Sequence, residues 1–330
     1  MNAPTTVQKQ SKNVILSRID FTTAGPIIGL ILTFIIFSIL SEPFLSTANI
    51  VNILRQSAII GIMAIGVTFV IITSEIDLSI GYNMAFAGIV AGAFATGGYG
   101  LGFQVSVFVA IPMGILTGAF FGYLSGVARA KLNIPSFMAT LSMMFIIEGA
   151  MLWFSGAQPL YGIPDSMQWF GNGNLFGIPA IIIVSLIVFI ISDIVLSKTV
   201  FGRNLYAIGG NDEAARMSGI DVGRYKIYVL TISGALSAMA GILMLGRIGS
   251  AQVTAGVGLM LPPIAAVILG GTSLFGGVGS MKKTVVGVLF MAVLVNGLNL
   301  LGVGSDGQKL ATGIVLIIAV AANAMGNLRK

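Results

Sequence analysis

Ten apolar runs divide this sequence, and they constrain its fold more than any other feature. They cover roughly residues 24–41, 58–73, 80–97, 104–124, 136–154, 179–196, 227–248, 262–277, 284–301 and 310–325. Each approaches the length that crosses the hydrocarbon core of a bilayer, and because the runs do not alternate in polarity, the spans are predicted to be helical. Only 8% of the residues are charged, too few to cover a water-facing surface. The sequence therefore predicts an all-α integral membrane protein with about ten transmembrane helices.

The runs also predict how the chain is divided. Residues 1–20 are polar and are expected to form a cytoplasmic tail, followed by a single transmembrane domain over residues 21–330. Residues 47–57 are expected to form a separate interfacial helix before the second span. Breaks rich in Gly and Ser near residues 73–81 and 270–280 predict short or broken helices, and paired interruptions of this kind point toward a transport path.

The distribution of basic residues predicts the orientation. With the N-terminus in the cytoplasm and ten alternating spans, only Arg55, Arg247 and Lys309 of the seventeen Lys and Arg residues lie outside, as the positive-inside rule requires. Both termini and a loop over residues 197–226 are then cytoplasmic, while residues 155–178 form an external loop. The net charge of +6 reflects these cytoplasmic segments and does not indicate nucleic-acid binding.

Several kinds of chemistry are excluded by composition. The chain has no cysteine and no histidine, which removes disulfides, thiolate nucleophiles, imidazole bases and the usual zinc ligands. There is no phosphate-binding loop, because the glycines and lysines of residues 276–283 stand in the wrong order. We therefore expect no enzymatic activity, no cofactor and no metal in this chain.

The loop over residues 197–226 contains a short predicted helix with signals at both ends. Asn211 is a favourable N-cap, Asp212 and Glu213 suit the positive end of the helix dipole, and Gly219 suits the position where the helix stops. Glu213 and Arg216 are three residues apart and could pair with each other or with a partner. A helix of about two turns is marginal alone, so it requires a surface on which to dock.

The break near residues 73–81 carries two carboxylates, Glu75 and Asp77, at the end of a long apolar run. A carboxylate in the membrane interior costs at least about 2.5–3.5 kcal/mol. One interpretation is that they line or gate a polar path together with Ser79 and Asn83; the other is a solvated cytoplasmic turn. Asp77 could also act as the N-cap of the third helix and satisfy its free amides.

Three further polar residues lie inside predicted spans: Glu148 in the fifth span, and Asn296 and Asn299 in the ninth. Asn296 and Asn299 are three residues apart and are expected to share a helix face. Such groups face other helices or a cavity. They could bind a polar solute along a translocation path, or form hydrogen bonds between helices.

Four motifs, in the same order and spacing, resemble one family. The run Glu213, Ala214, Ala215, Arg216, Met217, Ser218 and Gly219 fits the E-A-A-x-x-x-G signature of ABC importer permeases. Residues 209–220 are similar to the ribose/xylose/galactose-type sugar permeases in particular. So are residues 74–81 (S-G-I-D-L-S-V-G in the family), 269–280 (L-G-G-T-S-L-x-G-G-x-G) and 296–302. The resemblance extends from about Pro43 to the C-terminus, with one departure: the family usually has glycine where this chain has Glu75.

The resemblance implies a mechanism and a set of partners. Two permeases form the membrane pore, a cytoplasmic pair of ABC ATPase subunits drives it, and an extracytoplasmic sugar-binding protein delivers the solute. The segment from Asn211 to Gly219 would be the coupling helix seated on the ATPase. The expected location is the inner membrane of a prokaryote, with a homodimer of permeases preferred. Ribose, xylose, galactose, fructose, inositol and a furanosyl signalling molecule all remain open as solutes.

Two other classes of function are weighed against this interpretation. An ion-coupled secondary transporter would use Glu75, Asp77 and Glu148 as proton or sodium sites and would need no ATPase. A membrane-embedded enzyme is disfavoured because the sequence shows no clustered catalytic set.

Overall fold

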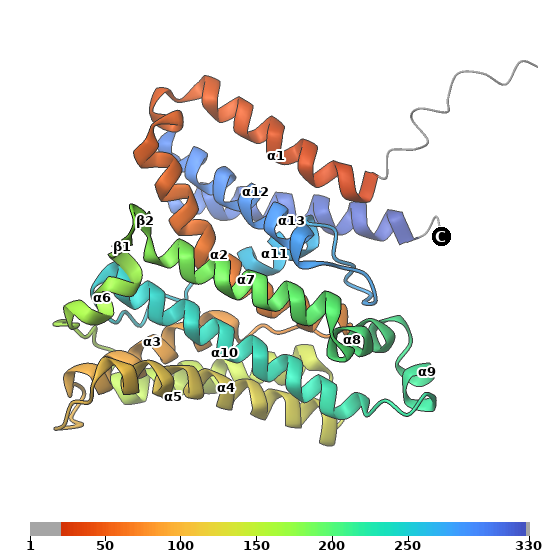
Figure 1. Cartoon of the computed structure of the whole chain (residues 1–330), viewed down its shortest axis with the longest axis horizontal. Coiled ribbons are helices and arrows are strands. Elements are labelled where there is room, and N and C mark those ends of the chain that lie inside the picture. The colour runs from red at the N-terminus through yellow and green to blue at the C-terminus, as the bar shows by residue number, and fades with distance from the viewer. Residues whose placement is uncertain (1–20, 328–330) are drawn as a thin grey trace, which may run out of the picture.

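The computed structural model describes residues 21–327 as a bundle of helices (Figure 1). In order, the elements are α1 (Phe21–Leu40), the 3-10 helix η2 (Glu42–Leu45), α2 (Thr47–Ile72), α3 (Ile80–Thr96), α4 (Val107–Lys131), α5 (Ser136–Ser155), α6 (Asp165–Asn172), β1 (Asn174–Leu175), β2 (Ile178–Pro179), α7 (Ala180–Lys198), α8 (Val200–Gly210), α9 (Asp212–Met217), α10 (Val222–Ile248), α11 (Leu261–Leu269), α12 (Met281–Leu300) and α13 (Ser305–Asn327). The predicted tail of residues 1–20 lies outside the described residues.

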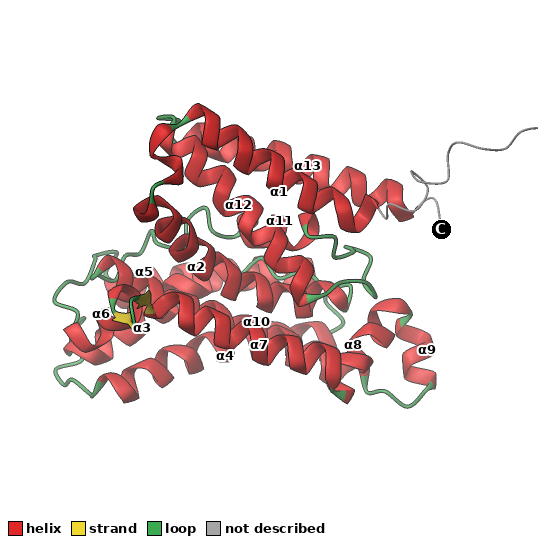
Figure 2. Ribbon diagram, turned by 45° about the horizontal axis from the view of Figure 1, so that its top comes forward, coloured by secondary structure: helices red, strands yellow, loops and turns green. Residues whose placement is uncertain are grey.

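The prediction of a helical membrane protein is confirmed in its coarse form. Within the described residues, six helices are long and apolar enough to cross a membrane: α2, α4, α5, α7, α10 and α12. Shorter apolar helices lie at residues 25–40 and in α3. Apart from the β1–β2 hairpin, the regular structure of the described chain is helical (Figure 2).

Helix α2 lies at the centre of the bundle. Every residue from Ile62 to Ile72 is buried, and the helix packs against α7, α10, α11 and α12. A helix that is apolar all round belongs in a core. The outer helices are built differently, because Ile190, Ile191 and Ile194 of α7 are exposed; a contiguous apolar surface of this kind suits contact with lipid.

Helices α4 and α10 approach each other closely because α4 carries a stripe of glycines. They recur at every fourth position: Gly114, Gly118, Gly122 and Gly126. A Cβ added at Gly122 would overlap the carbonyl oxygen of Leu230, and one at Gly126 would lie 2.7 Å from Ile227 Cα. Both neighbours belong to α10. Small residues allow this backbone contact between membrane helices.

One expectation is corrected by the structure, and the break predicted near residues 270–280 is present. Residues 47–57 do not form a separate interfacial helix, because α2 runs without interruption from Thr47 to Ile72. Ser46 is its N-cap, and the Ser46 hydroxyl accepts from the Asn49 amide. The eighth apolar run, residues 262–277, is helical only in its first half. Helix α11 ends at Leu269, and the following chain turns through Gly271, Gly276 and Gly277, which all have positive φ.

The two ends of the bundle differ in structure (Figure 1). Helices α8 and α9 lie at one end, where α1 also begins and α13 ends. The loop expected over residues 155–178 lies at the opposite end and contains α6 and the hairpin. The two-residue hairpin turn, Phe176–Gly177, has positive φ at both positions, which suits the right-handed twist of paired strands.

We expect Gly122→Ala to destabilise the protein, because its methyl group would push α4 away from the Leu230 carbonyl. Overpacking of this kind costs about 1–3 kcal/mol. The matched control is Gly149→Ala in α5, where an added Cβ meets nothing within 4 Å. Apparent melting temperatures of the detergent-solubilised protein, followed by size-exclusion chromatography after heating, measure the difference. Equal melting temperatures of the two variants would contradict backbone contact between α4 and α10.

Candidate functional site

The first broken segment, residues 73–79, separates α2 from α3. Helix α2 ends where the Thr73 hydroxyl donates to the Val70 carbonyl at 2.8 Å and Ser74 adopts a positive φ of 61°. The extended chain that follows finds partners on α5: the Ile76 amide donates to Ser136 Oγ and the Leu78 amide to Thr140 Oγ1, both at 3.1 Å. These hydroxyls satisfy backbone groups that lipid cannot.

Asp77 is buried in this segment with three donors around its carboxylate. The Ser79 amide and hydroxyl donate to Oδ1 at 3.0 and 2.6 Å, and the Ser233 hydroxyl of α10 donates to Oδ2 at 2.7 Å. The proposed N-cap role is therefore wrong in detail, because Ser79 is the residue that precedes α3. Asp77 nevertheless accepts from a free amide at that helix start and ties the break to α10.

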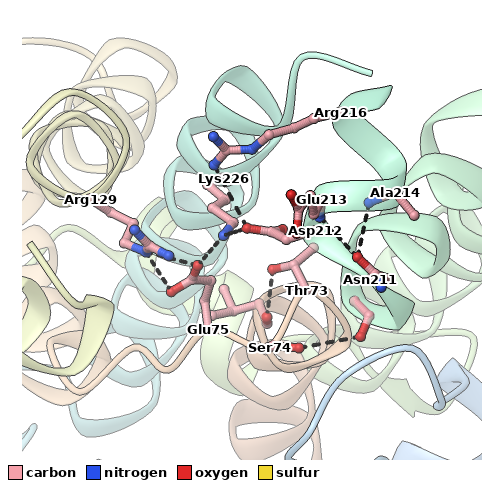
Figure 3. Close-up of polar contacts among 12 residues, drawn as sticks. Thr73, Ser74, Glu75, Arg129, Asn211, Asp212, Glu213, Ala214, Arg216 and Lys226 are labelled. Atoms are coloured by element: carbon pink, nitrogen blue, oxygen red, sulfur yellow. Dashed lines mark hydrogen bonds and ion pairs between the residues drawn. The ribbon is translucent and has the colours of Figure 1, made fainter. Parts of the chain in front are cut away.

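Glu75 is the centre of a chain of ion pairs (Figure 3). Its Oε1 lies 2.8 Å from Arg129 Nε at the end of α4 and 2.8 Å from Lys226 Nζ near the start of α10. Lys226 Nζ also lies 2.7 Å from Asp212 Oδ2 on α9, and Asp212 in turn lies 3.8 Å from Arg216. The side chains of Glu75 and Lys226 are 4% and 5% exposed. The interpretation of Glu75 as a solvated residue in a cytoplasmic turn is therefore wrong.

The second broken segment, between α11 and α12, interlocks with the first. The Ser74 hydroxyl donates to the Phe275 carbonyl at 2.8 Å, and the Gly277 amide donates to the Ile72 carbonyl at 2.9 Å. Gly209 at the end of α8 completes the contact: a Cβ there would overlap the Ile72 carbonyl oxygen and the Gly277 amide. The backbones of the two broken segments and of α8 are therefore in direct contact.

Tyr206 fastens α8 to the second break. Its hydroxyl donates to the Gly279 carbonyl at 2.8 Å. Burial raises the pKa of the Tyr206 phenol above its ordinary value, and the negative charge of Asp193 adds to the shift. The raised pKa extends the alkaline range over which the hydroxyl keeps its proton and acts as a donor.

Helix α9 has the caps that were predicted, although it is shorter. The Asn211 side chain accepts from the amides of Glu213 and Ala214 at 3.0 and 2.9 Å, and Gly219 has a φ of 83°. The helix spans six residues, Asp212–Met217. The suggested pairing of Glu213 with Arg216 does not occur, since Arg216 pairs with Asp212, one turn away.

One face of α9 packs on the protein and the other is exposed. Ala215 is buried with Ile208 of α8 and Val222 of α10. The exposed side chains are Asn211, Glu213, Ala214, Arg216, Met217 and Ser218. Met217 is 85% exposed, so the end of α9 carries an apolar side chain that the rest of the described protein leaves uncovered.

The other predicted path residues are spread over the bundle. Asn83 is fully buried on α3, and its amide donates to the Gly118 carbonyl at 3.1 Å. Glu148 is half-buried on α5 beside the Tyr82 hydroxyl. Asn296 is buried and exchanges two hydrogen bonds with Asn49 of α2, at 3.0 and 2.9 Å, whereas Asn299 is exposed. The two asparagines of α12 therefore do not share an environment.

Sequence reasoning missed the partners that hold the carboxylates. Arg129 and Lys226 were considered only as charges that set the orientation, and Ser136, Thr140 and Ser233 were not considered at all. The one available signal was Lys226, a lysine that directly precedes a long apolar run. Its partner Glu75 is far away in sequence, so no local spacing could connect them.

Comparisons with known proteins decide the family. A family model described as the permease component of a branched-chain amino acid transport system matches residues 49–320. The chain belongs to this family of ABC importer permeases. The permease is a multi-pass protein of the prokaryotic inner membrane.

Individual relatives of the permease carry names of sugar importers. It is 44% identical to the ribose import permease of Bacillus subtilis over 90% of this chain and 91% of the relative. It is 41% identical to the ribose import permease of Escherichia coli over 89% and 91%. A fructose import permease of Rhizobium meliloti is 36% identical over 90% and 84%.

We expect Gly209→Ala to weaken the permease, because the added methyl would separate α8 from both broken segments. The adjacent Gly210→Ala is the matched control, since a Cβ there meets nothing within 4 Å. Overpacking by one methyl group costs about 1–3 kcal/mol, enough to lower the apparent melting temperature by several degrees in Gly209→Ala alone. Equal melting temperatures for Gly209→Ala and Gly210→Ala would refute the close backbone contact between α8 and the two broken segments.

Proposed function

We propose that this permease moves a monosaccharide into the cytoplasm by alternating access, driven by ATP hydrolysis on a separate ATPase subunit. The observation that carries the proposal is α9: a capped helix of six residues, held by the buried Ala215 and by the ion pair of Asp212 with Lys226, with its outer face exposed. The names of the relatives, which refer to import of ribose and of fructose and to an L-arabinose ABC transporter, support a pentose, a hexose or a similar polyol as the solute.

The proposed topology has ten spans with both termini in the cytoplasm, in a single permease domain over residues 21–330. Each of the ten apolar runs contains a helix, and α1 begins at the same end of the bundle as α9, where α13 ends (Figure 1). An even number of crossings accounts for that arrangement. The end with α8 and α9 is the cytoplasmic one, and residues 155–178 face outward.

Helix α9 is proposed as the coupling helix. Asn211, Asp212, Glu213, Ala214, Ala215, Arg216 and Gly219 are the residues assigned to it. Asn211 and Gly219 define its ends, Ala215 holds it on the permease, and Glu213 and Arg216 project outward for the ATPase. Closure of the ATPases on ATP would displace α9 and shift the permease between its inward-open and outward-open states.

The gate is proposed at the first broken segment. Glu75, Asp77 and Ser79 follow Ser74, which reaches Gly209 of α8, and Asn83 lies one turn into α3. Glu148, Asn296 and Asn299 are also assigned to the translocation path, although they lie away from the first broken segment. Asn296 holds α12 to α2 through Asn49, Glu148 is half-buried and Asn299 is exposed.

The proposed assembly has four kinds of components. Two copies of this permease, as a homodimer, would form the pore in the lipid bilayer. ABC ATPase subunits would bind at the α9 end, and an extracytoplasmic sugar-binding protein would dock at the opposite end. The relatives are named as import permeases, which supports partners of these two classes.

An ion-coupled secondary transporter is the rejected alternative. It needs carboxylates that are free to exchange protons or sodium, but Glu75 is engaged by Arg129 and Lys226, and Asp77 accepts three hydrogen bonds within the protein. Membership of an ABC importer family also argues against it.

The test is the ATPase activity of the reconstituted complex with sugar-loaded binding protein. In Glu213→Ala/Arg216→Ala we expect the stimulation of ATP hydrolysis to fall about tenfold. A tenfold fall corresponds to a loss of about 1.4 kcal/mol of binding free energy between α9 and the ATPase. Asp221→Asn/Arg224→Ala is the matched control, because it also removes an exposed acid–base pair three residues apart, outside α9 and away from the end proposed for the binding protein. Transport by the permease alone, with no ATPase present, would contradict the proposal.

A further inference from the structure

We propose that Lys226 is a positioning residue that connects the coupling helix α9 to the gate, by pairing at the same time with Asp212 and Glu75. The inference rests on the function proposed above and goes beyond it, because it names the side chain through which α9 acts on the first broken segment. It is carried by two distances: Lys226 Nζ lies 2.7 Å from Asp212 Oδ2 and 2.8 Å from Glu75 Oε1.

Lys226 occupies a special place in the ion-pair chain. Glu75 has a second partner in Arg129, and Asp212 has a second partner in Arg216. Among the ion pairs of the described residues, Lys226 is the one cation that reaches both carboxylates (Figure 3). Removing it would cut the chain in two and leave each carboxylate with an arginine.

Burial makes the connection directional. The side chains of Lys226 and Glu75 are 5% and 4% exposed, whereas Asp212 is 40% exposed. Water can hydrate Asp212 when α9 moves, but it cannot readily replace either buried partner, and a buried charge without a partner is strongly unfavourable. A displacement of Asp212 is therefore passed to Lys226 and from there to Glu75.

The same face of α10 contacts the broken segment at a second point. Ser233 lies seven residues, or about two helical turns, after Lys226, and its hydroxyl donates to Asp77 at 2.7 Å. Lys226 and Ser233 thus hold the two carboxylates of the break from one helix. A shift at the start of α10 would move Glu75 and Asp77 together, since networks of hydrogen bonds and ion pairs can carry coupling between sites.

The decisive variant is Lys226→Met, which keeps the apolar length of the side chain and removes the charge. The matched control is Arg224→Met, in the same turn of α10, since Arg224 is exposed and pairs only with Asp221 among the described residues. Both are assayed in proteoliposomes containing the ATPase, with sugar-loaded binding protein supplied on the outside. The readout is the amount of sugar transported per ATP hydrolysed.

We expect Lys226→Met to hydrolyse ATP but to transport at least about fivefold less sugar per ATP, the lower end of typical coupling between sites. Arg224→Met should retain the ratio of the unaltered complex. Hydrogen exchange provides a readout that a purely structural brace would not change. On trapping with ATP and vanadate, protection of residues 73–81 should change in the unaltered complex and in Arg224→Met, but not in Lys226→Met.

Glu75→Gln provides an independent test if Lys226→Met fails to insert, because it keeps the shape of the buried side chain while removing its charge. It should show the same fall in transport per ATP. A normal ratio together with a normal exchange response in either inserted variant would overturn the proposal. If the unaltered complex itself shows no stimulation by the binding protein, the proposed function fails and the link fails with it.

Discussion

A break in a membrane helix leaves amide and carbonyl groups that lipid cannot satisfy, and the rest of this structure is arranged around meeting that requirement. At residues 72–79 the partners come from hydroxyls of α5, from the Asp77 carboxylate and from the Gly277 amide of the second break. Because the partners belong to different helices, the broken segment holds α5, α8, α10 and the α11–α12 connection together. A local backbone problem thereby becomes the junction of the bundle.

Charge follows the same logic at the edge of this junction. Burying the Glu75 carboxylate alone would be unfavourable, but it lies between Arg129 and Lys226. Lys226 also reaches Asp212 of α9. A glycine, which the family resemblance led us to expect at this position, could not make these contacts. The carboxylate therefore adds an electrostatic contact to a junction that backbone hydrogen bonds already define.

Local features of the site could be predicted from the sequence, and long-range ones could not. The Asn211 cap, the left-handed Gly219 and the two breaks follow from the residue types alone, because caps and turns depend on neighbours within a few positions. The continuity of α2 was missed because Asn49, Asn52 and Arg55 look interfacial; in the structure Asn49 pairs with Asn296, more than two hundred residues away. The role of Lys226 was missed because its partner Glu75 is also far away in the sequence.

The burial of α2 has a consequence for how the protein moves. A helix enclosed on every side from Ile62 to Ile72 cannot tilt or slide without opening voids against four neighbours, and close-packed interiors resist such voids. We therefore expect α2 to stay fixed while the helices around it move. In the proposed alternating-access cycle, the change between inward-facing and outward-facing forms would turn about the end of α2 at Ile72, so that the pivot and the proposed gate would be formed by neighbouring residues.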